Sequence, residues 1–238
     1  MITKQDIDNA TMHINGVNIA DYGVLVEKLK VGSIETEQSV YQGVNRTNFN
    51  VLDTIQHMRT IDISLFYTAK TRRELALIKS ELDNMMTGKL ELWVPDGFYY
   101  SAYLVNAGEE TYIGQEGDKV IALCPYQFKG IRHDPLQTVE TSAADDNLIY
   151  CKSTVPKTDC RLTCTASQNY ASLKIDTVTI TNVTAGDVLV VDGITGRILQ
   201  NGALCAGNMS FIHFPSLKSG KNNIDCVEDL TVEYYPTY

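Results

Sequence analysis

The segment 61–105 constrains the fold of this chain most strongly, because the spacing of its apolar residues changes twice. Apolar and polar residues alternate from 61 to 65, which is typical of a strand with one buried face. From Lys70 the apolar residues recur at steps of three and four. Alternation resumes at 90–94, and a strand rich in Tyr follows at 98–105. The segment therefore predicts a strand, a helix and two further strands around a turn, and it contains the only long helix expected in this sequence.

The helix is expected to span about 72–87. Thr71 and Glu74 have the spacing of a capping box, and Gly88 is a natural stop after the last turn. At 1.5 Å per residue such a helix is ~24 Å long, enough to cross one face of a sheet. We interpret its apolar stripe as a core face rather than a groove for a cofactor or partner; it consists of Leu75, Ile78, Leu82, Met85 and Met86.

Length and charge exclude several classes of protein. The 238 residues, 44% of them hydrophobic, suffice for one large or two small domains, and we expect two. The 20 basic and 29 acidic residues give a net charge of −9, so nucleic-acid binding is not expected. No segment approaches ~18 consecutive apolar residues, and the N-terminus lacks a secretory signal. We expect a soluble protein made in the cytoplasm, without membrane insertion.

The cysteines are expected to be free thiols. None belongs to a CxxC pair, and the absence of an export signal implies synthesis under reducing conditions. Cys160 and Cys164, with Cys151 nearby, could be three ligands of a metal, but the spacing is not that of a zinc finger and no His lies close in sequence. Small buried thiols are the favoured interpretation, and no metal or cofactor is expected. The six positions are Cys124, Cys151, Cys160, Cys164, Cys205 and Cys226.

The first half reads as a domain of strands around the helix. Residues 12–14 and 17–19 predict two strands joined by Asn15-Gly16, a dipeptide that suits a tight hairpin turn. The polar span 32–50 predicts an extended loop or hairpin. Because loops of this length in compact domains are usually functional or ordered by a partner, this span is a candidate contact surface.

The end of the first half has weaker signals. Gly108, Gly114 and Gly117, interspersed with glutamates, predict an acidic turn region. Lys119–Leu123 predicts a strand that ends at Cys124-Pro125-Tyr126. Residues 130–147 have the composition of a linker or domain edge, so the expected domains are 1–132 and 133–238.

The second half predicts a sandwich of short antiparallel strands with no helix. Turn signals such as Ala185-Gly186-Asp187, Asp192-Gly193 and Asn201-Gly202 separate the apolar runs. The expected strands are 148–151, 161–165, 173–175, 177–181, 188–191, 197–200, 209–213, 222–226 and 230–235.

The sequence shows no convergent catalytic constellation. The histidines are scattered outside any nucleophile or zinc-protease motif, and we interpret them as core or surface residues. Asp145-Asp146 and Glu109-Glu110 are adjacent carboxylates, which point to opposite faces of an extended chain and are expected to be solvated. We therefore expect no enzyme and no catalytic residue. The histidines are His13, His57, His133 and His213.

Taken together, these segments resemble the distal tail protein (Dit) family of long-tailed bacteriophages, over nearly the whole chain. The most specific part is the pattern of Gly186–Asp192, Asn201-Gly202 and Phe214–Asn222, which is similar to a "GE.L.ID…NG…FP.L.PG.N" pattern of the family. The other similar segments are Ile14-Asn15-Gly16, Asp21-Tyr22-Gly23, Ile61–Val94, Tyr100–Tyr103, Val120–Tyr126 and the terminal Tyr234–Tyr238.

The resemblance implies a mainly β protein in which each half has its own role. Residues 1–132 would form a β-sandwich-like domain with one long α-helix that assembles into a hexameric ring, and residues 133–238 a galectin-like β-sandwich. Such rings join the tail tube protein to the tail-tip, baseplate and receptor-binding proteins at the distal end of the tail. The chain would then be a structural virion protein, present in the host cytoplasm during assembly.

A carbohydrate-binding adhesin of a tail or cell surface is the alternative function. Tyr99, Tyr100 and Tyr103 could stack on sugar rings, although Tyr is equally suited to subunit interfaces. The one Trp, Trp93, falls in the first half rather than in the galectin-like half. The chain also lacks the large insertion that some relatives carry as a carbohydrate-binding module, so receptor binding by this chain itself is not expected.

Overall fold

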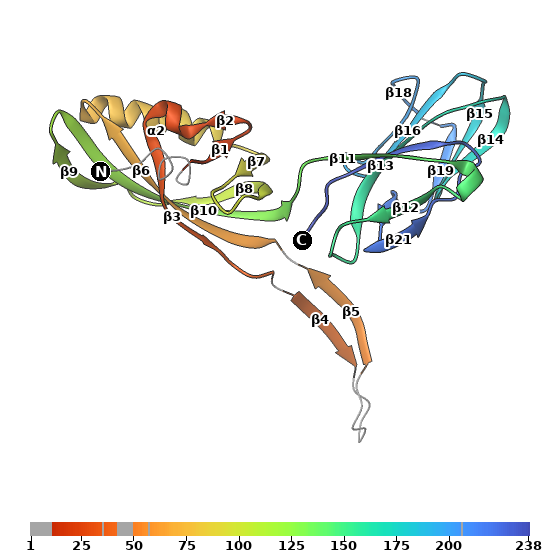
Figure 1. Ribbon diagram of the computed structural model, residues 1–238, viewed down its shortest axis with the longest axis horizontal. Helices are drawn as coiled ribbons and strands as arrows, with labels where there is room; N and C mark the ends of the chain where they lie inside the picture. The colour runs from red at the N-terminus through yellow and green to blue at the C-terminus, as the bar shows by residue number, and fades with distance from the viewer. Residues whose placement is uncertain (1–10, 35, 42–49, 57, 206) are drawn as a thin grey trace. The chain divides into compact units, whose positions relative to one another are not determined.

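The computed structural model describes residues 11–34, 36–41, 50–56, 58–205 and 207–238 (Figure 1). The chain divides into two compact units, Met1–Arg132 and His133–Tyr238. Over these residues, the structure confirms that the protein is mainly β with one α-helix. Each unit has its own hydrophobic core. The buried residues of one core all come from the first unit, and those of the other core all come from the second unit.

The first unit is built on one antiparallel sheet with the strand order β2-β1-β7-β8-β10-β6-β3, and β9 pairs with β10. Helix α2 and hairpin β1–β2 lie on the same side of β6 and β10 (Figure 1), and the core fills the space between them. A short 3₁₀ helix, η1 (Ile19–Tyr22), connects β2 to β3. The strands are β1 (His13–Ile14), β2 (Val17–Asn18), β3 (Val24–Val31), β6 (Arg59–Ala69), β7 (Leu90–Trp93), β8 (Tyr99–Ala107), β9 (Thr111–Glu116) and β10 (Lys119–His133).

The predicted hairpin turn between β1 and β2 is confirmed. Asn15 and Gly16 have φ angles of 51° and 81°, which are the positive values that both central residues of a type I′ turn require. Ile14 then faces Val17 in the register of the two strands.

Helix α2 (Arg72–Met85) confirms the predicted helix and ends two residues earlier than expected. The Thr71 hydroxyl accepts a hydrogen bond from the Glu74 amide at 3.1 Å. The Glu74 carboxylate accepts a hydrogen bond from the amide of Lys70 at 3.0 Å. In a standard capping box it would accept from the amide of the next residue, Thr71. The stripe faces the core: Leu75, Leu82 and Met86 are buried, and Ile78 and Met85 pack against the core in part.

A chain of polar side chains connects α2 to the sheet. The Tyr126 hydroxyl of β10 donates to Asp83 on the helix at 2.8 Å and shares a second hydrogen bond of 2.8 Å with Tyr67 of β6. Lys79 forms an ion pair with the same Asp83. Burial raises the pKa of Tyr67 and of Tyr126 well above the ordinary value. Both hydroxyls therefore keep the protons that these hydrogen bonds need.

Strand β10 corrects the prediction that the strand ends at Cys124-Pro125-Tyr126. The Pro125 carbonyl accepts a hydrogen bond from the Gly108 amide at 2.7 Å. Because the amide and carbonyl of one strand residue point to the same side, the missing N–H of Pro125 faces Gly108 and not the ladder with β6. At that point the neighbour of β10 changes from β9 to β8, so the strand continues past the proline.

The expected acidic turn region is also corrected. Residues 111–116 form β9, which pairs with β10 through a shift in register between Ile121 and Ala122. Its glycines do not prevent a strand, because Gly114 lies inside it and Gly117 makes the turn that follows, with φ of 61°.

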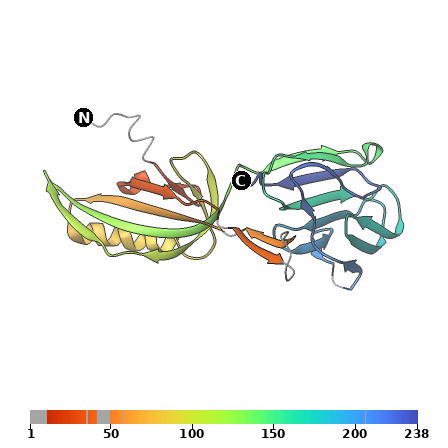
Figure 2. The same cartoon turned by 90° about the horizontal axis from the view of Figure 1, so that it is seen from below.

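Among its described residues, the second unit contains three antiparallel sheets, whose strands are drawn in green to blue in Figure 2. Their strand orders are β11-β22-β13-β16-β17-β18 with β20 on β13, β12-β21, and β14-β15-β19. All nine predicted strands form in whole or in part, while β11, β18 and β20 were not predicted. The bounds are β11 (Gln137–Thr141), β12 (Leu148–Cys151), β13 (Thr158–Thr165), β14 (Tyr170–Ile175), β15 (Val178–Val183), β16 (Val188–Asp192), β17 (Arg197–Gln200), β18 (Ala203–Leu204), β19 (Met209–Phe211), β20 (Ser216–Leu217), β21 (Gly220–Asn223) and β22 (Leu230–Tyr234).

The stretch 130–147, expected to be a linker or domain edge, contains the division between the two units at Arg132 and His133, but it is regular structure and not a linker. This stretch contains the end of β10, strand β11 and a 3₁₀ helix, η2 (Ala143–Asp145). Two of its polar residues, Thr141 and Asn147, are buried and bond internally. The Asn147 amide group donates to the carbonyls of Cys226 and Glu228 at 2.9 and 3.0 Å, and the buried Thr141 hydroxyl donates to the Asn147 side-chain oxygen at 2.8 Å.

Candidate assembly surfaces

The polar span 32–50 contains the first strand of a hairpin, formed by β4 (Thr36–Tyr41) and β5 (Asn50–Gln56). These two strands pair only with each other among the described residues. Residues 42–49, which include Gln42 and Asn45 of the predicted contact surface, lie outside the described part of the chain. Val40 and Tyr41 are 52% and 60% exposed. A two-stranded ribbon is marginally stable by itself, so a partner surface would stabilise this one.

A second surface is the sheet edge formed by the end of β8 and by β9. Strand β7 pairs with β8 only at residues 99–102, so the rest of β8 has no strand beside it on that side among the described residues. The exposed apolar side chains here are Tyr103, Val105, Tyr112 and Ile113. The guanidinium of Arg72, at the start of α2, lies 4.3 Å from the centre of the Tyr112 ring.

The three tyrosines considered for sugar stacking do not form one surface. Tyr100 is fully buried and its hydroxyl donates to Asp96. Tyr103 is 43% exposed, and Tyr99 is half-buried on the sheet. Trp93 is also half-buried and stacks on His13 at 5.2 Å between ring centroids. These residues are therefore divided between the core and the surface of the first unit.

The structure does not bring the histidines and adjacent carboxylates together into a site. His13 contacts Trp93, His133 is buried against Tyr235, and His213 is exposed, while His57 lies outside the described residues. The pairs Asp145-Asp146 and Glu109-Glu110 are exposed, as expected. In the part of the chain that is described, no group of three or more His, Cys, Asp or Glu residues could hold a metal ion.

All six cysteines are buried and unpaired. Burial raises the pKa of the Cys160 thiol, and negative charges at Asp176 and Asp159 add to the shift. The neighbouring Cys226 side chain and burial together raise the pKa of the Cys164 thiol. The Cys160 and Cys164 thiols therefore stay protonated at neutral pH and behave as small apolar groups.

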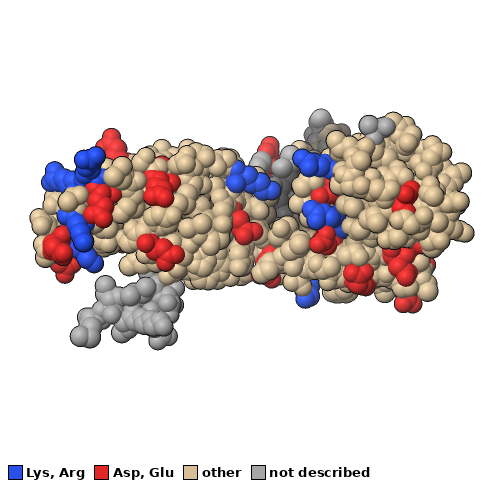
Figure 3. All heavy atoms as spheres, turned by 90° about the horizontal axis from the view of Figure 1, so that it is seen from above, with Lys and Arg blue, Asp and Glu red and all other residues tan. Residues whose placement is uncertain are grey.

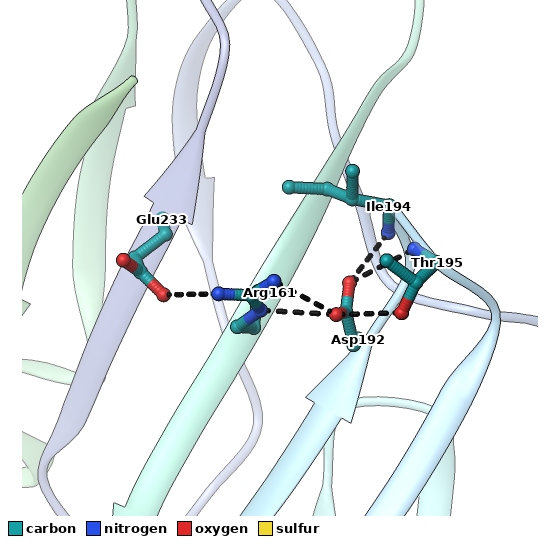
Figure 4. Close-up of polar contacts among 5 residues, drawn as sticks. All are labelled: Arg161, Asp192, Ile194, Thr195 and Glu233. Atoms are coloured by element: carbon teal, nitrogen blue, oxygen red, sulfur yellow. Dashed lines mark hydrogen bonds and ion pairs between the residues drawn. The ribbon is translucent and has the colours of Figure 1, made fainter. Parts of the chain in front are cut away.

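The outer face of the second unit's largest sheet contains a polar cluster centred on Arg161 (Figure 4). Arg161 lies on β13 between Asp192 of β16 and Glu233 of β22, its cross-strand neighbours. Its guanidinium bonds to Asp192 at 3.0 Å and to Glu233 at 3.1 Å. The Asp192 carboxylate also accepts the Thr195 hydroxyl at 2.7 Å and the amides of Ile194 and Thr195 at 2.9 and 3.0 Å. A shallow groove of about 390 Å³ lies over this cluster.

The negative charge of Asp192 is balanced within this cluster by the positive charge of Arg161. Burial alone raises the pKa of its carboxyl, but the hydrogen bonds from Thr195 and the charge of Arg161 outweigh burial and hold the pKa below its ordinary value. The carboxylate is therefore ionised at neutral pH, and its acceptor positions are already occupied. Sequence reasoning missed this cluster because its members are far apart in the chain, and only the strand register shows that they are neighbours.

Figure 3 shows acidic and basic side chains scattered over the face that it draws, without a continuous basic stripe among the residues it describes. Within the described residues, none of the helices combines the length and apolarity needed to cross a membrane.

Comparison with solved structures identifies the fold. The chain matches the Dit protein of phage SPP1, described as a hub of the adsorption apparatus in phages infecting Gram-positive bacteria, with a TM-score of 0.71 and 12% identity. The match covers 96% of this chain and 98% of that one. A structure of the phage P2 baseplate with Ca matches with a TM-score of 0.51 and 7% identity, over 91% and 92% of the two chains. A second structure of that baseplate, with Sr, matches with a TM-score of 0.52 and 7% identity, over 94% and 97%.

The comparisons by sequence find no counterpart: no family model and no curated protein matches this chain. The protein has the fold of the Dit hub, which confirms the fold expected from the resemblance of its motifs.

Proposed function

We propose that this chain is a structural protein of a phage tail tip, the hub that connects the distal end of the tail tube to the tail-tip and receptor-binding proteins. Its first unit forms a hexameric ring, and its second unit is a galectin-like domain that faces the neighbouring tail proteins. The assembly has no catalytic step and no cofactor. The protein resides in the virion after assembly in the host cytoplasm.

One observation carries this proposal: both units match the SPP1 hub together, over nearly the full length of both chains. A match confined to one unit would support a shared domain, whereas a match of two consecutive units supports a shared architecture. The surfaces of the first unit agree with a ring. Hairpin β4–β5 and the edge of β8 and β9 give it two separate exposed regions with apolar side chains, and a closed ring needs two different complementary surfaces on each subunit.

Electron microscopy of the purified chain tests the proposal. Class averages are expected to show closed rings with sixfold symmetry. Single particles of one chain, or open filaments of variable length, would contradict it.

Carbohydrate binding is the second candidate, and the groove over Arg161 is the observation that favours it. The groove is lined by Arg161, Asp192, Thr195, Arg197 and Glu233, polar groups of the kind that bind sugar hydroxyls. Binding of the whole chain to an oligosaccharide panel, lost on Arg197→Ala, would support this function. Absence of binding to every member of the panel would exclude it for those sugars.

A further inference from the structure

A polar hollow of about 380 Å³ lies on the face of the first unit's sheet opposite to the core. Asp62, Ser64 and Gln127 line it, and along β6 and β10 they alternate with residues that are buried in the core. This alternation places them on the outer face of the sheet. We call the hollow the Lys28 pocket, and its polar lining consists of Lys28, Lys30, Asp62, Ser64, Asn106 and Gln127.

A β-bulge in β3 brings two lysines to this pocket. Glu27 has no partner opposite it in the register of β3 and β6, and Lys28 lies opposite Ser64. Lys30 follows on the same face, opposite Asp62. A strand without the bulge would place Glu27 opposite Ser64 and reverse the sign of the charge there. The bulge therefore re-aims a positive side chain into the pocket, a use of bulges that is common beside binding and active sites.

The donor groups of the Lys28 pocket are not used inside the chain. Among the described residues, none of four lining side chains forms a hydrogen bond or an ion pair. The carboxylate of Asp62 accepts the Gln127 side-chain amide at 2.9 Å and makes no ion pair with either lysine. The pocket therefore offers ammonium, hydroxyl and amide donors to a ligand rich in acceptors. The four side chains are those of Lys28, Lys30, Ser64 and Asn106.

The charge of the pocket is opposite to that of the chain, which has a net charge of −9. Lys28 and Lys30 face one carboxylate, Asp62, and Lys129 lies on the same outer face of β10. Three lysines against one aspartate leave an excess of two positive charges. Two hollows of the second unit differ from this one. The hollow beside η2 has three carboxylates and one lysine, and the groove over Arg161 has equal numbers of both signs.

We propose that the Lys28 pocket binds a phosphate group, as the free ion or as a small phosphate monoester. Such a group carries a charge of about −2 near neutral pH and several strong acceptor oxygens. It matches both the excess positive charge and the donors that come from β3, β6 and β8. A carboxylate has one charge and two oxygens, and the planar arginine fork that suits it best is absent from the lining. This role is additional to the structural function proposed above and does not depend on it.

Isothermal titration calorimetry of the full chain near neutral pH tests the proposal with inorganic phosphate as the probe. Wild type is expected to bind it, and Lys28→Gln and Lys30→Gln should each weaken binding about tenfold, because each removes one charged donor. Asp62→Asn removes the opposing negative charge and should bind phosphate more tightly than wild type. Lys89→Gln, which removes the same charge at an exposed position outside the pocket, is the matched control and should bind like wild type.

Further ligands identify the source of the phosphate group. Glycerol phosphate that binds at least as tightly as inorganic phosphate identifies an organic monoester, and binding of inorganic phosphate only identifies the free ion. Equal binding of acetate, or of an oligothymidylate without a terminal phosphate, would overturn the inference, because the pocket would then recognise any anion or a phosphodiester.

The binding test is separate from the test of the proposed function. Both lysines are exposed, so their substitution leaves the core intact, and circular dichroism checks the fold of each variant. Wild type that fails to bind phosphate, or binding that is equal in all four variants, would overturn the inference. Light scattering of the same samples measures ring formation independently, so either proposal can fail while the other stands.

Discussion

At the scale of single residues, Asp192 is expected to contribute to the stability of the second unit. Its carboxylate pairs with Arg161 and accepts three further hydrogen bonds from residues 194 and 195. Asp192→Asn keeps one acceptor oxygen but places an NH₂ group against donors, so we expect a loss of about 1–3 kcal/mol in the free energy of unfolding. Urea denaturation measures it. The control is Asp225→Asn, whose partner Lys174 and carboxylate are both more than half exposed, and which should change stability little.

The same carboxylate gives a pH dependence with a definite sign. The folded-state pKa of Asp192 lies below its ordinary value. A carboxyl of this kind stabilises the fold above its unfolded pKa, about 4, and the contribution is lost as the pH falls through the folded pKa. The difference in unfolding free energy between wild type and Asp192→Asn should be constant above about pH 5 and shrink below pH 4. A difference that is the same at pH 3 and pH 7 would show that the ionised carboxylate is not the cause.

Gly193 tests close packing in the turn after β16. A Cβ at this position would lie 2.6 Å from the Pro215 carbonyl oxygen and 2.9 Å from that of Cys160. Both are backbone atoms that cannot move aside, so Gly193→Ala should lower the free energy of unfolding by about 1–3 kcal/mol. Gly114→Ala, where a Cβ would meet nothing within 4 Å, is the control, and calorimetry compares the two. Equal melting temperatures for both variants would contradict the packing argument.

Residue patterns with local causes were predictable from the sequence, and those with distant causes were not. The hydrogen bond from the Glu74 amide to Thr71 and the turn at Asn15-Gly16 depend on neighbours within four residues, and both form. The cluster of Arg161, Asp192 and Glu233 depends on strand register, which a single sequence does not fix. Tyr100 illustrates the same limit: it is fully buried, whereas Tyr99 is half-buried and Tyr103 is 43% exposed, although all three belong to one Tyr-rich segment.

At the scale of elements, helix α2 is the part on which the first unit depends most. Leu82 is fully buried, whereas Leu77 on the same helix is 62% exposed. Leu82→Asp would place an unpaired carboxylate in the core and should cost several kcal/mol, enough to unfold the first unit. Leu77→Asp introduces the same side chain on the solvent face and should cost about 0.5 kcal/mol or less. Circular dichroism with thermal melting compares them, and a folded Leu82→Asp protein would show that α2 is not a core element.

The elements missed by sequence reasoning share a physical reason. Strands β18 and β20 are two residues long and show no alternation that could be detected. Strand β11 contains mostly polar residues, because only Thr141 is buried. Strand β10 continues through Pro125 because the missing amide N–H of the proline points to the place where the neighbouring strand changes from β9 to β8. This arrangement depends on the pairing of three strands. Long periodic segments such as β6 and α2 were predictable because each has its own core stripe.

At the scale of the whole molecule, the separate cores predict that the first unit is self-sufficient. Its buried core residues all lie between Met12 and Phe128, and those of the second unit lie between Ile149 and Tyr234. A fragment ending at Arg132 is therefore expected to fold and assemble, while a fragment 133–238 should fold and stay monomeric. Analytical ultracentrifugation of both fragments measures this. If only the second fragment assembles, the ring-forming role belongs to the other half.

The central claim is that the intact chain closes into a ring of six, and its mass in solution tests that claim most directly. Size-exclusion chromatography with light scattering should give about six times the 26.5 kDa of one chain, unchanged over a tenfold range of concentration, because a closed ring leaves no free contact for further growth. A mass of one chain, or a mass that keeps rising with concentration, would contradict it.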